Sequence, residues 1–340
     1  MTAPSLAVAA ANRCRFTAAT TGGHVESYFW RANDPMAARA IWLKATILAP
    51  LAGHPIAEVW VVVFDGATDR VFAHKDTVPF ARAVFDDAGE IKVGGCQFRW
   101  GELGEASGSA QHGGQACAWQ LRWQRCDGPA GDPLSMLPLP AMLDGPFPKS
   151  KLLTPLPALA FSGTIECFGH TWKLHDWKGM QGHNWGKEHA YEYAWGQCLF
   201  ADHGPVDAMV EAFSARVRIA GLLTPRLSCL VVRRGAERYT FNQLVDVWRQ
   251  KAEVGMRHWK LAMAGKDGTA TLEMRATGLP MACLAYGNPN GDVSYCFNSK
   301  LAHTTLAVHP TAGAPFELVS AHGGALELLR KQPELGMAVV

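Results

Sequence analysis

Short segments in which apolar and polar residues alternate, each ended by turn-forming residues, run through most of this sequence and restrict its fold most strongly. In one of them Trp119, Leu121 and Trp123 alternate with polar residues. Successive side chains of a β-strand point to opposite faces, so a period of two is typical of a strand with one buried face. Residues 59–64 are instead apolar at every position, which indicates a strand buried on both faces. The chain is therefore predicted to be all-β.

A proline-rich stretch divides these segments into two series. Residues 127–160 contain eight prolines, and proline lacks the amide donor that helices and central strands require. We expect no strand or helix there, but an extended segment that packs against the surface and connects two halves. The prediction is an N-terminal β domain at residues 1–126, the connector at 127–160 and a C-terminal β domain at 161–340, each an antiparallel barrel or sandwich. Helical character is limited to residues 242–254 and 325–331.

Composition and charge exclude several classes of protein. Of the 340 residues, 48% are apolar and only 18% are charged, which suits a globular chain with a well-buried core. Lys and Arg total 32 against 30 Asp and Glu, so the chain lacks the basic excess of proteins that bind nucleic acids. A transmembrane helix needs an apolar run of about 18 residues, and the sequence contains none. A secretory signal has basic residues before its apolar run, whereas no basic residue precedes the first apolar run of this chain. Nine cysteines without a C-x-x-C pair indicate reduced thiols in a cytoplasmic protein.

Titratable and aromatic side chains are concentrated in residues 170–203. No other stretch is as dense in them, and it includes four tryptophans, Trp172, Trp177, Trp185 and Trp195. Glycines between residues 179 and 186 favour a backbone that leaves the sheet between two strands. We therefore expect this stretch at the mouth of a barrel or at the seam between the domains.

Within it, a Gly-His-Asn-Trp-Gly sequence at residues 182–186 is followed by Trp-Gly-Gln at residues 195–197. This arrangement resembles the lipocalin-fold superfamily of carotenoid 1,2-hydratase (hydroxyneurosporene synthase) and tocopherol cyclase, in which an Asp-His-x-Trp-Gly type motif precedes a strand that carries Trp. The resemblance implies two lipocalin-like domains and an apolar, isoprenoid-like ligand. For an enzyme it implies acid-initiated addition to, or cyclisation at, a carbon–carbon double bond. The acidic residue of the motif is replaced here by Gly182, so the acid is not carried over.

Protonation of an alkene requires a positioned acid, a site poor in water and aromatic faces that stabilise the cation. The acids available in this stretch are Asp176, Glu188, Glu192 and Asp202, and burial in an apolar site would raise the pKa of any of them. We select Asp176, next to a tryptophan, together with His183 and Glu192 as the candidate catalytic residues. Asp176 would otherwise only cap a turn, which is a common role for aspartate.

Five further residues are candidates for substrate binding: Trp177, Asn184, Trp185, Trp195 and Gln197. The resemblance implies that His183 and Asn184 orient a carboxylate or a polar head group. The alternative is that both hydrogen-bond the loop backbone. The tryptophans either stabilise a cation or fill the core of a barrel.

Metal and cofactor motifs are lacking. Residues 188–192 do not contain the second histidine of an H-E-x-x-H site, no cysteine pair completes a zinc site, and neither a nucleophilic-serine nor a phosphate-binding motif occurs. We therefore expect neither a metal nor a cofactor.

In the N-terminal half, Glu26, Arg31 and Lys44 interrupt apolar segments. They either face solvent, or Glu26 and Lys44 form a buried polar pair.

The sequence thus favours a cofactor-independent hydratase- or cyclase-type enzyme that acts on an apolar terpenoid-like or polyketide-like molecule. Two alternatives stay open: a non-catalytic carrier of a lipophilic small molecule, and a protein scaffold without a ligand. The enzyme and the carrier both require an apolar cavity near the four tryptophans, walled by sheet and reached by a carboxyl group.

Overall fold

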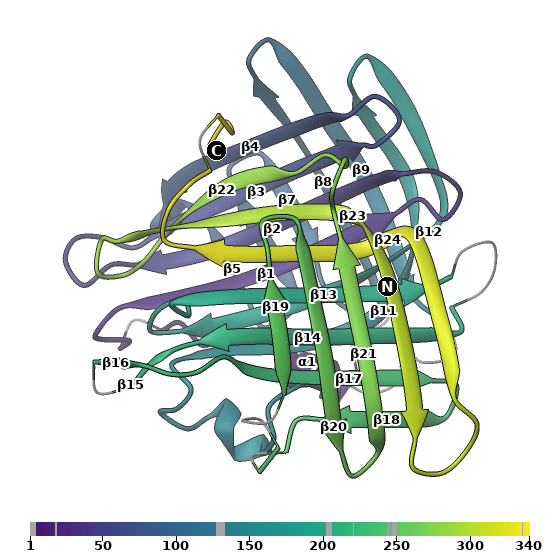
Figure 1. Ribbon diagram of the computed structural model, residues 1–340. Coiled ribbons are helices and arrows are strands. Elements are labelled where there is room, and N and C mark those ends of the chain that lie inside the picture. The colour runs from purple at the N-terminus through teal and green to yellow at the C-terminus, as the bar shows by residue number, and fades with distance from the viewer. Residues whose placement is uncertain are drawn as a thin grey trace.

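The computed structural model describes residues 5–17, 19–126, 133–201, 206–219, 221–243, 245–246, 250–334 and 336–340. Two large antiparallel β-sheets make up most of it (Figure 1), so the all-β prediction is confirmed. Helical elements are short: α1 (Leu6–Asn12), η1 (Phe80–Arg82) and η2 (Pro140–Leu143). Among the described residues, no helix combines the length and the apolar character needed to cross a membrane.

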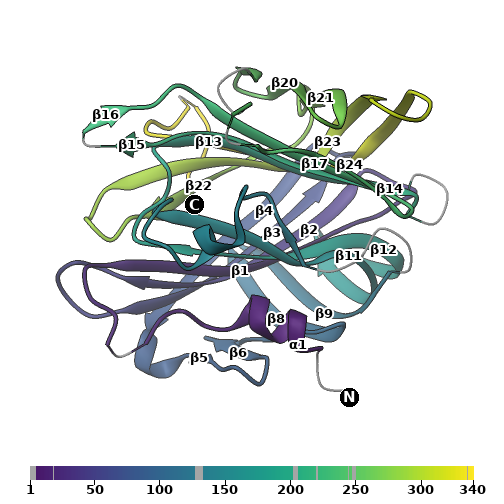
Figure 2. The ribbon, with the colours of Figure 1, turned by 90° about the horizontal axis from the view of Figure 1, so that it is seen from below.

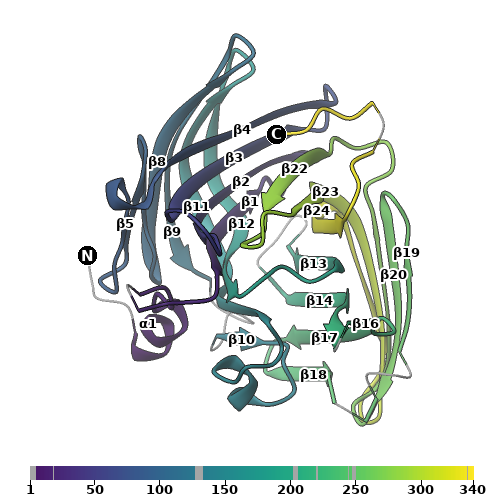
Figure 3. The ribbon, with the colours of Figure 1, turned by 90° about the vertical axis from the view of Figure 1, so that its left-hand side faces the viewer.

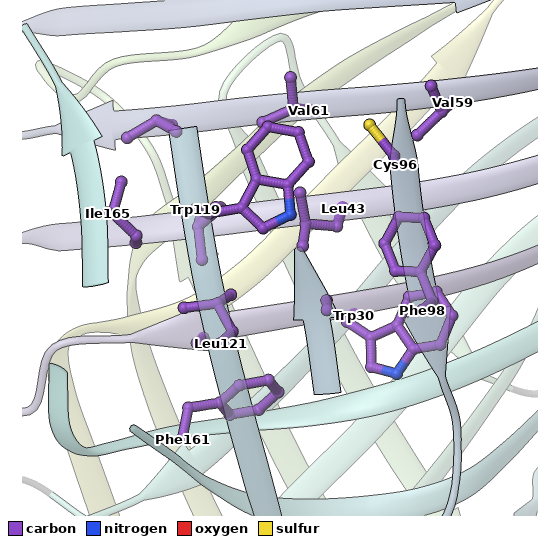
Figure 4. Close-up of a cluster of buried hydrophobic side chains, with 14 of the residues drawn as sticks. Trp30, Leu43, Val59, Val61, Cys96, Phe98, Trp119, Leu121, Phe161 and Ile165 are labelled. Carbon is purple, nitrogen blue, oxygen red and sulfur yellow. The ribbon is translucent and has the colours of Figure 1, made fainter. Parts of the chain in front are cut away.

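The first sheet contains twelve strands, in the order β4-β3-β2-β1-β12-β11-β9-β8-β7-β6-β5, with β10 beside β11. Their bounds are β1 (His24–Asn33), β2 (Arg39–Ala49), β3 (Ile56–Asp65), β4 (Arg70–Pro79), β5 (Val84–Phe85), β6 (Glu90–Val93), β7 (Cys96–Arg99), β8 (Leu103–His112), β9 (Gln115–Arg125), β10 (Leu134–Ser135), β11 (Ser150–Cys167) and β12 (His170–Gly186). The sheet curls around an apolar core in which Trp30, Phe98 and Trp119 are buried (Figure 4).

The second sheet has ten strands, in the order β18-β17-β14-β13-β24-β23-β21-β20-β19, with β22 beside β23. Their bounds are β13 (Glu192–Phe200), β14 (Ala208–Arg216), β17 (Leu227–Arg234), β18 (Glu237–Phe241), β19 (Lys251–Val254), β20 (His258–Gly265), β21 (Gly268–Arg275), β22 (Ala282–Gly287), β23 (Val293–Pro310) and β24 (Phe316–Arg330). The strands β15 (Arg218–Ile219) and β16 (Leu222–Leu223) form a separate pair.

The two sheets lie against each other (Figures 2 and 3), and the three large apolar cores of the described residues lie one inside each curled sheet and one between the sheets. The strand β3 shows the consequence for sequence. Val59, Val61 and Val63 face the core of the first sheet, whereas Trp60 and Val62, with the adjacent Phe64, face the core between the sheets. The prediction that residues 59–64 are buried on both faces is confirmed.

The expectation of a connector without strands is wrong for residues 150–160, which begin β11. Two prolines, Pro155 and Pro157, fit inside β11 because its ladder is interrupted there. On one side the pairing with β12 shifts register between Leu153 and Leu159. On the other side, the pairing with β10 extends only as far as Thr154 of β11, and the pairing with β9 begins at Leu159. The two prolines, which lack an amide donor, fall in the gap between these pairings. Residues 127–132 of the expected connector lie outside the described part of the chain.

The boundary between the sheets also differs from the expected boundary at residue 160. Because β11 and β12 pair with β9 and β1, residues 161–186 belong to the first sheet, and the chain passes to the second sheet at residues 187–191. The helix expected at 325–331 is wrong, since residues 325–330 end β24. This part of β24 is buried on both faces, and an apolar run of this kind lacks the period of two. In the other expected helix, residues 251–254 form β19, and residues 244 and 247–249 lie outside the described residues.

Candidate functional site

Charged and polar side chains are buried among aromatic ones in the space between the two sheets. Alternation along β1 directs Tyr28 and Trp30 into the first sheet's own core, and directs Phe29 and Arg31 toward the second sheet. We call the following buried residues the inter-sheet layer: Arg31, Lys44, Trp195, Gln197, Glu211, Tyr286, Lys300 and Glu327. A buried charge is costly unless it is matched, so this layer is the first place to look for function.

The carboxyl group of Glu211, on β14, lies at one end of the layer and has no exposed surface. Thr154 Oγ1 lies 2.8 Å from both of its oxygens and donates to them, and Trp195 Nε1 donates to Oε1 at 3.0 Å. Burial raises the pKa of Glu211 to about 7, against the opposing effect of these two hydrogen bonds and of Arg233 and Arg31. Near neutral pH this group can therefore both release and accept a proton.

Trp195 connects Glu211 with the rest of the layer. Its indole nitrogen is bound to Glu211, its ring meets the Phe29 ring edge-on at 5.7 Å between centroids, and Lys300 Nζ lies 5.7 Å from its centroid. Trp195 thus holds the carboxyl at the edge of its ring, and an aromatic ring next to a carboxyl that can be protonated is the pairing that acid-initiated chemistry at a double bond requires.

A small recess lies beside Arg31. It is partly open to solvent, and its lining includes Arg31, Leu199 and His322. The Arg31 guanidinium donates to the side-chain oxygen of Gln197. Gln197 in turn lies directly opposite Glu211 in the pairing of β13 with β14. Arg31 and Gln197 thus connect the recess with the strand pair that carries Glu211.

The carboxylates selected from the sequence lie elsewhere. The side chain of Asp176 is 65% exposed and forms an ion pair with Lys178, and its backbone φ of 58° is left-handed. Glu192 is partly exposed at the start of β13, 3.4 Å from Arg226. Glu188 is also partly exposed and pairs with Lys149 at 2.9 Å. These three positions lack the exclusion of water that alkene protonation needs. Asp202, the fourth candidate, lies outside the described residues.

His183 is fully buried, inside the first sheet's curl rather than between the sheets. Its Nε2 lies 2.8 Å from Glu26 Oε1 and its Nδ1 2.8 Å from the Ala11 carbonyl, while its ring stacks on Tyr28 with centroids 4.2 Å apart. Glu26 also binds His24 at 2.8 Å and accepts backbone hydrogen bonds from residues 15 and 16 at 2.9 Å. Burial alone would raise the pKa of Glu26, but the hydrogen bonds from His183 and His24 hold it far below its usual range. This cluster fastens residues 11–16 to β1 and β12.

Glu26, Arg31 and Lys44 are all buried, so the alternative in which they face solvent is wrong. The other alternative, a Glu26–Lys44 pair, is also wrong. In the pairing of β1 with β2, Lys44 lies opposite Phe29, whereas Glu26 lies opposite Ile47. The two charges consequently point to opposite faces of the first sheet, Glu26 toward His183 and Lys44 toward the second sheet.

The four tryptophans do not line one cavity, contrary to the expectation. Trp172 and Trp177 belong to the core of the first sheet. Trp185 packs with residues 11 and 153, with the Arg15 guanidinium 4.4 Å from its ring centroid. Only Trp195 lies in the core between the sheets. Of the five predicted binding residues, the structure brings Trp195 and Gln197 to Glu211, while the half-buried Asn184 lies opposite residue 27 of β1.

Gly182, which replaces the acidic residue of the motif, also faces the layer. A Cβ atom at this position would lie 2.2 Å from Cζ of Phe29, and the same Phe29 ring contacts Trp195. The ring therefore fills the space that an acidic side chain at residue 182 would need. Glu211, which also contacts Trp195, is a buried carboxyl that is not among the residues predicted from the sequence. Its signal was a lone carboxylate in an otherwise apolar segment, residues 208–213.

Comparison with known proteins supports the architecture. No family model matches the chain. Two uncharacterized proteins from two strains of Mycobacterium tuberculosis are 25% identical over 288 residues, which cover 82% of this chain and 80% of theirs. A protein described as AttH from Nitrosomonas europaea has a TM-score of 0.55 at 11% identity, over 91% of this chain and 93% of its own. The fold is lipocalin-like.

Two further solved structures share this fold. Kievitone hydratase from Nectria haematococca has a TM-score of 0.52 at 12% identity, covering 91% of this chain and 89% of its own. The protein CghA has a TM-score of 0.54 at 9% identity, covering 92% of this chain and 89% of its own. At these identities the likeness concerns the fold, and the resemblance to lipocalin-like proteins holds at that level.

Among the described residues, no group of three or more His, Cys, Asp or Glu side chains is placed to hold a metal ion.

Proposed function

We propose that this chain is a cofactor-independent enzyme of the hydratase or cyclase type that works between its two sheets, with Glu211 as the acid. The observation that carries the proposal is a fully buried carboxyl with a pKa near 7, held by Thr154 and Trp195. A general acid is most effective when its pKa lies near the working pH. The fold shared with a kievitone hydratase agrees with this function.

In this mechanism the Glu211 O–H bond breaks as a C–H bond forms at one carbon of the substrate's double bond. The other carbon becomes a cation, which the face of Trp195 stabilises. For a hydratase, the oxygen of a water molecule then bonds to the cation and one of its protons returns to the Glu211 carboxylate. For a cyclase, a second double bond attacks the cation and the proton lost afterwards returns to Glu211. Either sequence regenerates the acid.

The substrate is an apolar terpenoid-like or polyketide-like molecule, because the side chains packed around Trp195 are mainly apolar and aromatic. We place its access at the recess beside Arg31, from which Gln197 leads to the acid. Asp176, His183 and Glu192 are not assigned a step, because the first and last are partly or largely exposed and His183 binds Glu26.

The test begins with mass spectrometry of small molecules that co-purify with the native protein, which identifies a substrate. Turnover is then measured for Glu211→Gln, which keeps the shape and a side-chain oxygen for Thr154 but cannot deliver a proton. We expect a loss of about 100-fold or more in turnover with substrate binding retained. The exposed Glu253 on β19 offers a matched control, and Glu253→Gln should keep full activity.

Other outcomes contradict the proposal. Full turnover in Glu211→Gln, or its loss in Asp176→Asn instead, would move the acid to another residue. A ligand that co-purifies and is bound but never transformed would indicate the non-catalytic carrier.

A further inference from the structure

The end of the inter-sheet layer away from Glu211 holds a lysine without an anionic partner. Lys44, on β2, is 4% exposed. Its Nζ lies 3.7 Å from the centroid of the Tyr286 ring. It makes no hydrogen bond or ion pair to any residue in the described part of the chain. A cation–π contact compensates a buried ammonium only in part.

The neighbouring carboxylates are already used. Lys300, which has no exposed surface, binds Glu327 Oε1 at 2.6 Å, and Asn298 donates to the same oxygen at 3.2 Å. Glu58, the other carboxylate whose charge acts on Lys44, pairs with Lys75 at 3.6 Å. Burial lowers the pKa of both Lys44 and Lys300, with Glu327 opposing that effect. The two buried ammonium groups thus lie near one buried carboxylate, Glu327, which pairs with Lys300, and the charge of Lys44 is left without an anionic partner.

Three hydrogen-bond donors without a strong acceptor belong to aromatic side chains near Lys44. The hydroxyl of Tyr286 has only the Cys296 thiol, a weak acceptor, as a hydrogen-bonding neighbour, and the indole nitrogens of Trp42 and Trp60 are buried without a partner. Lys44 lies over the ring of Tyr286 and 5.9 Å from the ring centroid of Trp42, and Trp60 meets Tyr286 edge-on at 5.4 Å. Burial raises the pKa of Tyr286, so its hydroxyl keeps its proton and can donate it in a hydrogen bond. Native proteins leave few buried donors unpaired. Two unpaired indole nitrogens and a weakly paired hydroxyl near an ammonium without an anionic partner form a cradle for a negatively charged oxygen.

This cradle is connected to the proposed acid through one side chain. Lys300 Nζ lies 5.3 Å from the ring centroid of Trp42 and 5.7 Å from that of Trp195, whose indole nitrogen binds Glu211. A molecule whose double bond lies over Trp195 would therefore place a group at the other end of its skeleton beside Lys44.

We propose that Lys44, Tyr286 and Lys300 bind an acidic oxygen group of the substrate, so that the substrate is an apolar alkene carrying a carboxylate or an ionised enol. This inference rests on the proposed function for the identity of the site, but it concerns binding and not proton transfer. The group is recognised by charge and by the donors of Tyr286, Trp42 and Trp60, and the apolar skeleton extends from there toward Trp195.

The test compares two ligands that share a skeleton and differ in charge, together with a cyclic acid of another skeleton. Geranic acid is the carboxylate probe, geraniol its neutral counterpart, and dimedone an acidic 1,3-diketone that probes the ionised enol. Binding is followed by isothermal titration calorimetry on the full chain at neutral pH. We expect geranic acid to bind at least about tenfold more tightly than geraniol, and we expect this preference to disappear in Lys44→Met, which has a similar volume without the charge.

Two further variants make the result specific. Tyr286→Phe removes only the hydroxyl and should weaken the binding of geranic acid without changing that of geraniol. Lys260→Met, at an exposed lysine of β20, should keep the full preference. Lys44→Met should also fold and melt at a higher temperature than the parent in the absence of ligand, because it removes an unmatched buried charge. A higher affinity for dimedone than for geranic acid would assign the site to an enolate.

Equal affinities for geranic acid and geraniol, a preference that survives in Lys44→Met, or no binding of either acid would overturn the inference. These outcomes are independent of the proposed function, which fails only if Glu211→Gln keeps its turnover or the bound ligand is never transformed.

Discussion

Glu211→Gln should make the protein more stable at neutral and higher pH, and this follows from the burial of the carboxyl. The folded protein raises the pKa of Glu211 from 4.5 to about 7, so between these values the folded state holds a proton that the unfolded state has released. A carboxyl whose pKa is higher in the folded state makes its full contribution to stability at pH values below its pKa in the unfolded state. This contribution is lost as the pH rises through the pKa of the folded state. At about 1.4 kcal/mol per pH unit, the free energy of unfolding of the wild type should fall by about 3 kcal/mol between the two pKa values because of this group alone.

The assay is urea unfolding followed by tryptophan fluorescence, for wild type and Glu211→Gln, at about pH 4.5 and about pH 8. Glutamine does not ionise, so the difference between the two free energies of unfolding isolates Glu211 from every other titrating group. We expect that difference to move by about 3 kcal/mol in favour of the variant between the two pH values. An unchanged difference would mean that Glu211 ionises normally, and the argument for a buried acid would be refuted.

Three other predictions follow from the same contacts. Gly182→Ala should cost about 1–3 kcal/mol in stability, because its Cβ would lie 2.2 Å from the Phe29 ring; thermal melting should show the loss, and Phe29→Ala should relieve the clash. Glu26→Gln should destabilise the fold by about 3–5 kcal/mol, because it removes the carboxylate that His24, His183 and two backbone amides share. Hydrogen exchange should show residues 11–16 opening first in that variant, and unchanged protection there would contradict the role assigned to Glu26. Trp195→Phe should raise the pKa of Glu211 further, since the indole hydrogen bond lowers it; an unchanged value on carbon-13 NMR titration would show that this bond is weak.

Local pattern was sufficient for most of the sheet structure. The alternation at Trp119, Leu121 and Trp123 correctly predicts β9, with all three side chains in the core of the first sheet. The apolar run at residues 59–64 correctly predicts a strand with two buried faces. Both features depend only on the period of side chains along an extended chain, which neighbouring strands do not alter.

Predictions that depend on neighbouring strands were less successful. Pro155 and Pro157 are tolerated in β11 because the strands on that side leave a gap, and a single sequence does not reveal where a partner strand begins. The face to which Glu26 and Lys44 point depends on the register and curl of β1 and β2, so their burial and separation could not be derived from spacing.

The candidate site shows the same limit. The sequence predicts Trp195 and Gln197 because they follow the motif on the next strand, β13. Glu211 and Thr154 come from strands distant in sequence, β14 and β11, and converge only when the two sheets pack together. A lone glutamate in an apolar strand is a signal that becomes specific once the strand is known to face another sheet.

The most direct test of the account is a carbon-13 NMR titration of the Glu211 side-chain carboxyl in the full chain, with Glu211→Gln used to assign its resonance. The account predicts that this carbon titrates with an apparent pKa of about 7. Titration near 4.5, the ordinary value for a glutamate, would show a carboxyl that is already ionised at neutral pH and would contradict its role as the acid.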